Sequence, residues 1–154
     1  MDEGIIRNLM IREAGEADLP RVLPLFAGLG LDNGRVLDAD AARRLFERMR
    51  SYPDYRLYLA VLEGEVLGAF ALLVMDNLGH LGAPSGVVED VVVLEGWRGR
   101  GIGREMMRFA MNRCREKHCY KMVLSSNRRR VDAHRFYRSL GFREHGLSFE
   151  VDVT

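Results

Sequence analysis

Glycines and arginines alternate in the stretch RGRGIGR at residues 98–104, directly after an apolar run and before a helical pattern. Glycine lacks a Cβ atom, so main-chain N–H groups in such a loop can approach an oxyanion closely. At a helix start, the positive end of the helix dipole adds to this attraction, and arginines can add charge-assisted hydrogen bonds. The stretch therefore predicts a site for a phosphorylated ligand. Its expected contact residues are Arg98, Gly99, Arg100, Gly101, Ile102, Gly103 and Arg104.

The spacing argues against three common phosphate-binding loops. A Walker loop ends in Gly-Lys-Ser/Thr, whereas Gly103 is followed by Arg104 and Glu105. A dinucleotide fingerprint needs the spacing G-x-G-x-x-G on the first strand of the fold, and GRGIG has another spacing late in the chain. A mobile arginine-glycine segment that binds RNA is disfavoured because this single unit lies between strongly periodic elements.

Two adjacent acids, Glu89 and Asp90, interrupt the apolar run VVEDVVV at residues 87–93. Side chains alternate between the faces of a strand, so a regular strand points these acids to opposite faces and places Glu89 with Val91 and Val93. A buried carboxylate is costly unless it has a partner or a task, so one acid is expected to meet a substrate amine. Because bulges are common near sites, the sequence leaves open which acid does so, and a salt bridge to an arginine remains the alternative.

The surrounding elements are predicted from hydrophobic periodicity and from helix start and stop signals. Strand patterns cover residues 9–15, 55–63, 66–76, 87–93, 120–126 and the closing pair in 142–154; helical patterns cover 16–30, 39–50, the segment from Ile102, and 131–140. Asp38 is expected to cap the second helix, Pro53 to prevent its continuation, and a turn around Gly64 and Glu65 to close a hairpin. The order is βααβββαβαββ. It predicts an α/β fold with a mixed sheet, because strand-helix-strand alternation implies local parallel pairing.

The chain has 154 residues, which suits a single domain over 1–154. Its 23 basic and 22 acidic residues give a net charge of +1, so neither nucleic acid nor a membrane is expected as a partner. The start lacks the basic and apolar regions of a signal peptide, and a cytoplasmic location is expected. Cys114 and Cys119 have no paired histidine spacing, so we expect reduced packing residues and no metal.

The segment VVVLEGWRGRGIGREMM resembles motif A of the GNAT N-acetyltransferases, whose R/Q-x-x-G-x-G/A signature is matched by Arg98, Gly101 and Gly103. AHRFYRSLGF resembles a later motif of that family. The resemblance is close over Val87 to Val151 and rests on element order before that. It implies acetyl-CoA as co-substrate, with its pyrophosphate on residues 98–104, and an acetyl transfer to an amine.

The resemblance also implies roles for individual residues. The strand Val91, Val92 and Val93 would pair with the pantetheine arm, and Tyr137 would lie near the coenzyme sulfur and protonate the departing thiolate. Glu89 or Asp90 would orient or deprotonate the amine, and an N–H near Val92 or Val93 would stabilise the oxyanion. In the run NRRR, Asn127 and Arg130 are the candidates to contact the coenzyme phosphate or the substrate, although a charge run in a loop is usually just solvated. His80 and His134 are expected to be structural.

Several segments look like the glucosamine-6-phosphate N-acetyltransferase branch: VEDVVV, CYK and the ending LGF. The asparagine that this branch places a turn before its tyrosine is Ala133 here, so the acceptor stays open among small primary amines, including amino sugars, aminoglycosides and amino acid derivatives. Two alternatives are a peptide or protein N-acetyltransferase and an acyl-CoA-binding module without catalysis. The branch also pairs subunits through its last strand, so LSFEVDVT could form a homodimer. The sequence does not fix the acyl length.

Overall fold

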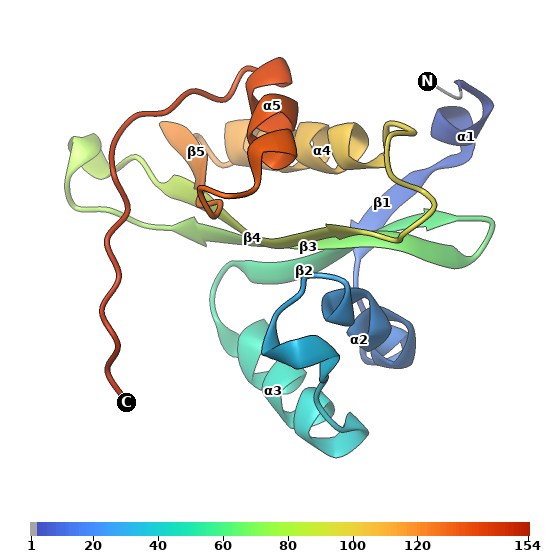
Figure 1. The fold of residues 1–154 in the computed structure, drawn as a ribbon. Coiled ribbons are helices and arrows are strands. Elements are labelled where there is room, and N and C mark those ends of the chain that lie inside the picture. The colour runs from blue at the N-terminus through green and yellow to red at the C-terminus, as the bar shows by residue number, and fades with distance from the viewer. Residues whose placement is uncertain (1–2) are drawn as a thin grey trace. The chain divides into compact units, whose positions relative to one another are not determined.

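The structure, a computed structural model, describes residues 3–154, which fall into two units divided between Val123 and Leu124. Its helices and strands are α1 (Glu3–Asn8), β1 (Met10–Glu13), α2 (Leu19–Ala27), α3 (Ala39–Ser51), β2 (Tyr55–Leu62), β3 (Glu65–Met75), β4 (Ser85–Val93), α4 (Ile102–Glu116), β5 (Lys121–Leu124) and α5 (Val131–Ser139) (Figure 1). Short 3-10 turns occupy Glu16–Asp18, Asp32–Gly34 and His80–Gly82. The predicted order from the first strand to the last helix is confirmed, and α1 is an addition that the sequence did not predict.

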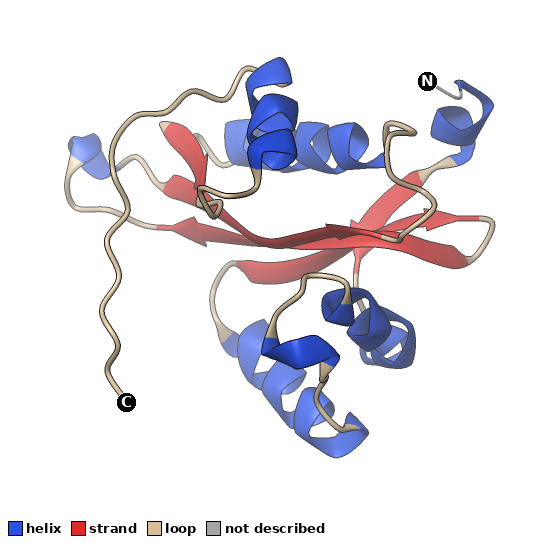
Figure 2. Cartoon of the chain, in the orientation of Figure 1, coloured by secondary structure: helices blue, strands red, loops and turns tan. Residues whose placement is uncertain are grey.

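The five strands lie in chain order across one mixed sheet, β1-β2-β3-β4-β5. The three pairings from β1 to β4 are antiparallel. Helices α2 and α3 cover one face of the sheet, and α4 covers the other (Figure 2). We call these the α2/α3 face and the α4 face. This division decides which side chains of β4 can meet a ligand, because successive residues of a strand point to opposite faces.

Apolar side chains fill the space on both faces of the sheet. On the α2/α3 face, Val22 of α2 and Leu59 of β2 are fully buried in a cluster that includes Val92 of β4. On the α4 face, two glycines let the helix approach closely, because a Cβ at Gly68 would lie 2.9 Å from the Met106 sulfur and one at Gly86 would collide with the Cys114 sulfur. Met106 and Cys114 of α4 therefore face the core, as the packing role expected for Cys114 requires. Burial raises the pKa of the Cys114 thiol to about 12, so the group stays protonated and packs as an apolar side chain.

The predicted helix boundaries are confirmed where a side chain or a backbone angle sets them. The Asp38 carboxylate accepts a hydrogen bond of 2.9 Å from the Ala41 N–H and caps α3, which ends at Ser51 before Pro53. Gly141 follows α5 with a φ of 93°, a left-handed conformation that glycine adopts readily. The hairpin turn lies one residue earlier than predicted. Glu63 and Gly64 both have positive φ, and Glu65 already pairs with Leu62.

The prediction of a closing pair of strands in residues 142–154 is wrong for a single copy of the chain, because the structure has no strand there. The alternating apolar side chains of this tail lie in solvent: Leu147, Phe149, Val151 and Val153 are 80%, 88%, 81% and 90% exposed. A strand pattern becomes a strand only when another strand supplies hydrogen-bond partners. The tail therefore has the sequence pattern of a strand, but residues 3–154 of one chain supply no partner strand for it.

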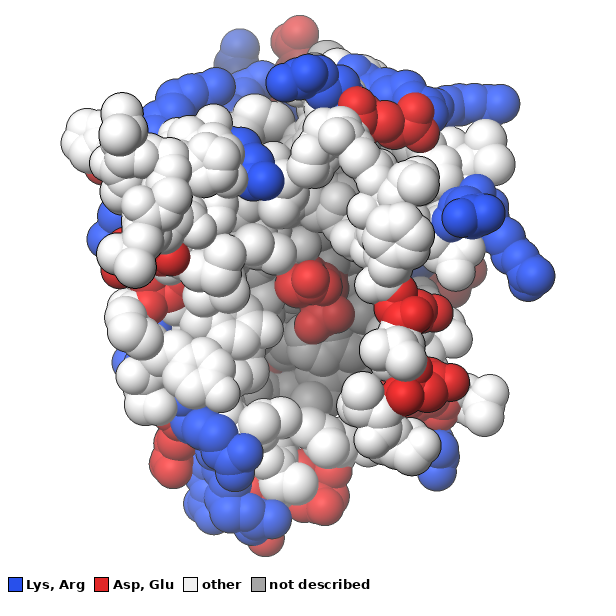
Figure 3. Space-filling model, turned by 90° about the vertical axis from the view of Figure 1, so that its left-hand side faces the viewer, with Lys and Arg blue, Asp and Glu red and all other residues white. Residues whose placement is uncertain are grey.

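Within residues 3–154, no helix is long and apolar enough to cross a membrane. On the molecular face drawn in Figure 3, basic side chains gather mainly along the upper edge and at the lower left, and acidic side chains lie in the central hollow and on the right. This distribution agrees with the small net charge of +1.

Candidate active site

A β-bulge in β4 carries the two acids. Ala69 of β3 pairs with Val92 and Ala71 pairs with Glu89, so two residues, Asp90 and Val91, lie opposite the single residue between these pairs. Asp90 takes a φ of 53°, in the left-handed region where aspartate and asparagine are the most common residues after glycine. The irregularity that the sequence left open is therefore present at the acids themselves.

The bulge changes the face on which the acids lie. Glu89 is opposite Ala71, and Val92 is opposite Ala69, so both residues point to the α2/α3 face. Val93 pairs with Gly68, whose Cβ position faces Met106 of α4, so Val93 points to the α4 face. The regular alternation that grouped Glu89 with Val93 is therefore wrong. The physical reason is the extra residue, which shifts the alternation of every later side chain by one.

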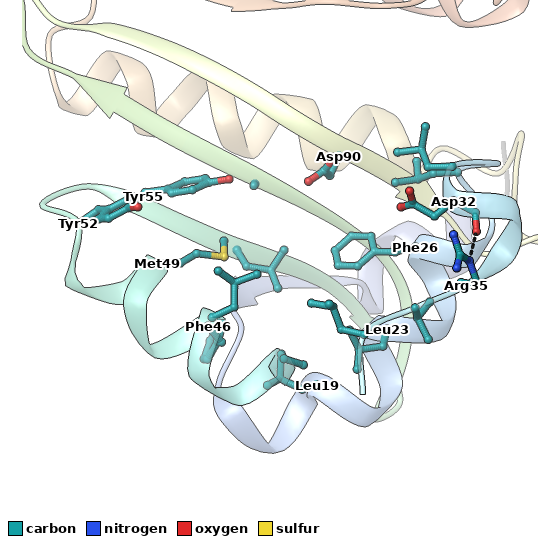
Figure 4. A pocket seen from close by; sticks show the side chains of 18 residues that line it. Leu19, Leu23, Phe26, Asp32, Arg35, Phe46, Met49, Tyr52, Tyr55 and Asp90 are labelled. Carbon is teal, nitrogen blue, oxygen red and sulfur yellow. Dashed lines mark hydrogen bonds between the residues drawn. The ribbon is translucent and has the colours of Figure 1, made fainter. Parts of the chain in front are cut away.

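A pocket of about 840 Å³ opens on the α2/α3 face, and Asp90 lies in its wall. Figure 4 shows the Asp90 carboxylate and the Tyr55 hydroxyl near one another, above the apolar side chains of α2 and α3. Its lining residues are Leu19, Leu23, Phe26, Leu29, Leu31, Asp32, Arg35, Val36, Leu37, Ala42, Leu45, Phe46, Met49, Tyr52, Tyr55, Leu57, Ala71 and Asp90. The pocket has the size and the mainly apolar lining of a small-molecule site.

Tyr55 lies in the pocket lining, near the carboxylates of Asp90 and Glu89. Burial raises the pKa of its phenol, and the nearby carboxylates of Asp90 and Glu89 raise that pKa further. Neither acid makes an ion pair with another side chain among the described residues. Two carboxylates without a basic partner, beside a protonated phenol, form a place where a cationic amine is stabilised. The salt bridge considered as an alternative is absent from this part of the chain.

The glycine-rich loop has the backbone geometry that a diphosphate site needs. Gly99 has a φ of 76°, and Gly101, with a φ of 92°, is the N-cap of α4 and has no side-chain cap. The first N–H groups of a helix have no partners within the helix, so those of residues 102–104 are available for a ligand. The Ile102 side chain is 1% exposed and packs in the core, so only its backbone can reach a ligand.

Two arginines of the loop make contacts within the protein, and a third is partly exposed. The Arg98 Nε–H donates a hydrogen bond of 3.3 Å to the Val93 carbonyl, which fastens the loop to the end of β4. The Arg100 guanidinium lies 4.9 Å from the centroid of the Trp97 ring, a cation–π contact. Both contacts hold the loop in shape, and Arg104 lies partly exposed in the first turn of α4.

The outer edge of β4 continues past the neighbouring strand. The Tyr120 N–H donates 3.0 Å to the Pro84 carbonyl, so β5 begins beside the start of β4. β5 has four residues and β4 has nine. The backbone at Val91–Val93 therefore extends beyond the reach of β5. Those of its N–H and C=O groups that point away from β3, apart from the Val93 carbonyl bound by Arg98, are left for an extended ligand that adds to the sheet.

The second unit holds the other predicted residues. Asn127, Arg129 and Arg130 form a turn before α5, with the Asn127 side-chain oxygen accepting 2.9 Å from the Arg129 N–H and its carbonyl accepting 3.0 Å from the Arg130 N–H. His134 Nε2 lies 2.9 Å from the same Asn127 carbonyl, in keeping with the structural role expected for it.

Tyr137 lies on α5, with its ring against two other aromatic rings of the second unit. The centroid distances are 5.2 Å to Phe136 and 5.5 Å to Phe142. Burial raises the pKa of its phenol, and the positive charge of Arg130 partly opposes this rise. A phenol with a raised pKa keeps its proton at neutral pH, which a proton donor requires.

Sequence reasoning missed the pocket and the residues that shape it. Tyr52 and Tyr55 stack with ring centroids 5.9 Å apart, and neither belongs to a motif. A usable signal was the loop between the first two predicted helices, whose apolar residues Leu31, Val36 and Leu37 have no evident purpose in a solvated loop. Among residues 3–154, no group of three or more His, Cys, Asp or Glu side chains could hold a metal ion.

Comparison with known proteins places this geometry in a family context. The family model described as "Acetyltransferase (GNAT) family" matches residues 27–142. A glucosamine 6-phosphate N-acetyltransferase of Trypanosoma brucei brucei is 32% identical over 96% of this chain and 98% of its own length. An aminoalkylphosphonate N-acetyltransferase of Salmonella typhimurium is 33% identical over 96% of this chain and 93% of its own length. A solved structure of a putative acetyltransferase from Agrobacterium tumefaciens is 32% identical, covers 93% of this chain and 99% of that one, and superposes with a TM-score of 0.87.

Proposed function

Because the chain belongs to the GNAT acetyltransferase family, we propose that it transfers the acetyl group of acetyl-CoA to the primary amine of a small molecule held in the α2/α3 pocket. One observation carries the proposal. The continuous segment Glu89–Arg104 joins two unpaired carboxylates beside the pocket to the glycine-capped start of α4. An amine and a diphosphate could therefore be bound along the same strand and loop.

The co-substrate would be held mainly by main-chain groups. The N–H groups of residues 98–104 would bind the diphosphate of acetyl-CoA, since Gly99 and Gly101 keep Cβ atoms away from it. The extended backbone of Val91–Val93 would pair with the pantetheine arm. From the second unit, Asn127 and Arg130 would contact the adenosine phosphate, since both are exposed at the turn before α5.

The reaction proposed is direct attack. Acetyl-CoA supplies an activated thioester carbonyl. The bound ammonium first loses one proton to solvent, and the neutral amine nitrogen then forms a bond to that carbonyl carbon while the C–S bond breaks. Asp90 or Glu89 would orient the amine and accept its proton, directly or through a water, and an N–H near Val92 or Val93 would stabilise the developing oxyanion. Tyr137 would give its proton to the thiolate of coenzyme A. The products would be the N-acetylated amine and the free thiol of coenzyme A.

The test is acetyl-CoA-dependent release of free thiol across a panel of amines, with Asp90→Asn and Glu89→Gln as variants. Asparagine tolerates the left-handed backbone at position 90, so the bulge is retained while the charge is lost. We expect each variant to lower kcat/KM for the amine and to leave the Kd for coenzyme A within about twofold, because only the acceptor side changes. If both variants acetylated the best amine as well as the wild type, the proposed roles would be wrong.

Binding without turnover is the second function to be separated. The unpaired carboxylates argue for catalysis, because an acyl-CoA sensor needs no acidic groups at its acceptor pocket. If coenzyme A bound but no amine released thiol, the chain would be an acyl-CoA-binding module. Acetylation of peptides in preference to small amines would instead favour a protein N-acetyltransferase.

We further propose that the exposed tail pairs with a second copy of the chain as a homodimer. Leu147, Phe149, Val151 and Val153 alternate along residues 147–153, and each is at least 80% exposed. A second chain would supply the strand partner and the apolar cover that this pattern needs. The chain is proposed to be one functional domain over 1–154. A cytoplasmic location fits the free thiols of Cys114 and Cys119.

A further inference from the structure

The charges around the pocket are few and unbalanced. Three of its eighteen lining residues are charged: Asp32, Arg35 and Asp90. Arg35 is the single base of this lining, and its Nε–H donates a hydrogen bond of 3.2 Å to the Asp32 carbonyl (Figure 4). This hydrogen bond is to the main chain and leaves the Arg35 charge in place, but two lining acids, together with Glu89 next to the pocket, outnumber the one base. The site favours a cation and disfavours a phosphate dianion.

The amine end of the pocket is marked by Asp90, Glu89 and Tyr55. Glu89 pairs with Ala71, which lines the pocket, and Asp90 follows it in the chain and lines the pocket too, so both carboxylates lie at this part of the site. In Figure 4, Asp90 lies above the α2 and α3 side chains, between Tyr55 on the left and Asp32 and Arg35 on the right. An ammonium group between the two acids would leave the rest of an acceptor to extend over the apolar lining.

That remaining wall is apolar and aromatic. Leu23 and Phe26 of α2 face Phe46 and Met49 of α3 across the cavity. Tyr52 stacks on Tyr55 with an interplanar angle of 14°, which extends a flat aromatic surface away from the acids. Such a lining stabilises hydrocarbon or an aromatic ring, and it offers few hydrogen-bond partners to the hydroxyl groups of a sugar.

We infer that the acceptor is a primary amine with an apolar or aromatic body and without a phosphate or phosphonate group. This inference rests on the proposed acetyl transfer and narrows its substrate. The relatives from Trypanosoma brucei brucei and Salmonella typhimurium are named for a phosphorylated amino sugar and for aminoalkylphosphonates. The chain would share their chemistry and differ in the group that lies at the far end of the pocket.

The first experiment compares matched acceptors by thiol release. The apolar set is butylamine, pentylamine, hexylamine and 2-phenylethylamine; the anionic set is glucosamine 6-phosphate, paired with glucosamine, and 2-aminoethylphosphonate, paired with propylamine. We expect kcat/KM to rise about fourfold per methylene until the pocket is filled, because each methylene leaves water for an apolar wall. Each anionic acceptor is expected to be poorer than its partner, and 2-phenylethylamine at least tenfold better than glucosamine 6-phosphate.

The second experiment adds a cation to the pocket. Leu45 lies in the lining on α3 and is 41% exposed, so Leu45→Arg places a guanidinium there without opening the core. The matched control is Glu47→Gln, on the exposed side of the same helix, which raises the net charge by the same single unit. Leu45→Arg is expected to raise the ratio of kcat/KM for glucosamine 6-phosphate over hexylamine at least tenfold, and Glu47→Gln to leave that ratio unchanged.

The outcomes separate this inference from the proposed activity. If glucosamine 6-phosphate or 2-aminoethylphosphonate were acetylated better than every apolar amine, the inference would be overturned and the acetyltransferase would stand. If the alkylamine series were flat, the apolar wall would not contact the acceptor, and the inference would also be overturned. If no acceptor released thiol while coenzyme A bound, the proposed activity would fail first. If Leu45→Arg does not fold, the comparison of acceptors with the unmodified protein tests the inferred acceptor preference by itself.

Discussion

The left-handed backbone at Gly101 allows a sharp test of the diphosphate loop through Gly101→Ala. With φ at 92° and ψ at −1°, this residue caps α4 where the first free N–H groups begin. An L-residue in this region costs about 1–2 kcal/mol, and about 2–4 °C of Tm is lost per kcal/mol in a protein of this size. The variant is therefore expected to melt about 2–8 °C lower.

The effect on coenzyme binding should exceed this strain. Either the loop keeps its shape with a methyl group close to the diphosphate, or it relaxes and turns its N–H groups away. In both cases we expect the Kd for coenzyme A to rise at least about tenfold, which corresponds to about 1.4 kcal/mol. Isothermal titration calorimetry well below the melting temperature measures this change on folded protein.

Gly96→Ala is the matched control for Gly101→Ala. Gly96 also has a positive φ, 85°, and an added Cβ there would meet nothing within 4 Å, but the residue lies outside the predicted contacts 98–104. Its Tm should fall by a similar amount, whereas its Kd for coenzyme A should stay within about twofold of the wild type. Equal coenzyme affinity in wild type and Gly101→Ala, or equal loss in both variants, would refute the reasoning.

Three more perturbations follow from other parts of the structure. Tyr137→Phe should lower kcat about a hundredfold with little change in the Kd for coenzyme A, and an unchanged kcat would remove Tyr137 from the mechanism. Because the pKa of the Tyr137 phenol is raised, the wild-type rate should hold up to about pH 10, the ordinary tyrosine pKa. Asp18→Asn should destabilise the fold by at least about 2 kcal/mol at pH 7 in urea unfolding, because the buried carboxylate accepts two hydrogen bonds of 2.8 Å from Arg12 and others from Arg21 and the Gly15 N–H. The Arg12 hydrogen bond holds the pKa of Asp18 well below its usual range. The extra stability of the wild type over Asp18→Asn is therefore present above about pH 4 and is lost as pH falls through the lowered pKa of Asp18. A stability difference that does not change with pH would contradict this role of the carboxylate. Ending the chain after Gly146 should convert a dimer into a monomer in light scattering, and an unchanged mass would show that the tail holds no partner.

Local signals in the sequence predicted most of the fold. Asp38 capped its helix, Gly141 ended another, and the strands and helices up to α5 follow the predicted order, because caps, turns and periodicity act over a few residues. The turn at Glu63–Gly64 was displaced by one residue, since turn and strand pairing together set the register.

Features that depend on distant residues were harder to predict. The tail 142–154 has a strand pattern, but its partner strand is not within the residues described, so no local rule could place it. The bulge at Asp90 arises from pairing with β3, and it places Glu89 on the same face as Val92, where regular alternation would have grouped it with Val93. The pocket required α2, α3 and three strands to meet, which no motif encodes.

The central claim is that main-chain N–H groups at the start of α4 bind a diphosphate. The most direct measurement is calorimetric titration of the unmodified protein with coenzyme A and, in parallel, with pantetheine, which keeps the thiol arm and lacks the diphosphate. The account predicts that coenzyme A binds at least about tenfold more tightly, since the diphosphate supplies the contacts with residues 98–104. Equal affinities for the two ligands, or no heat with coenzyme A, would contradict it.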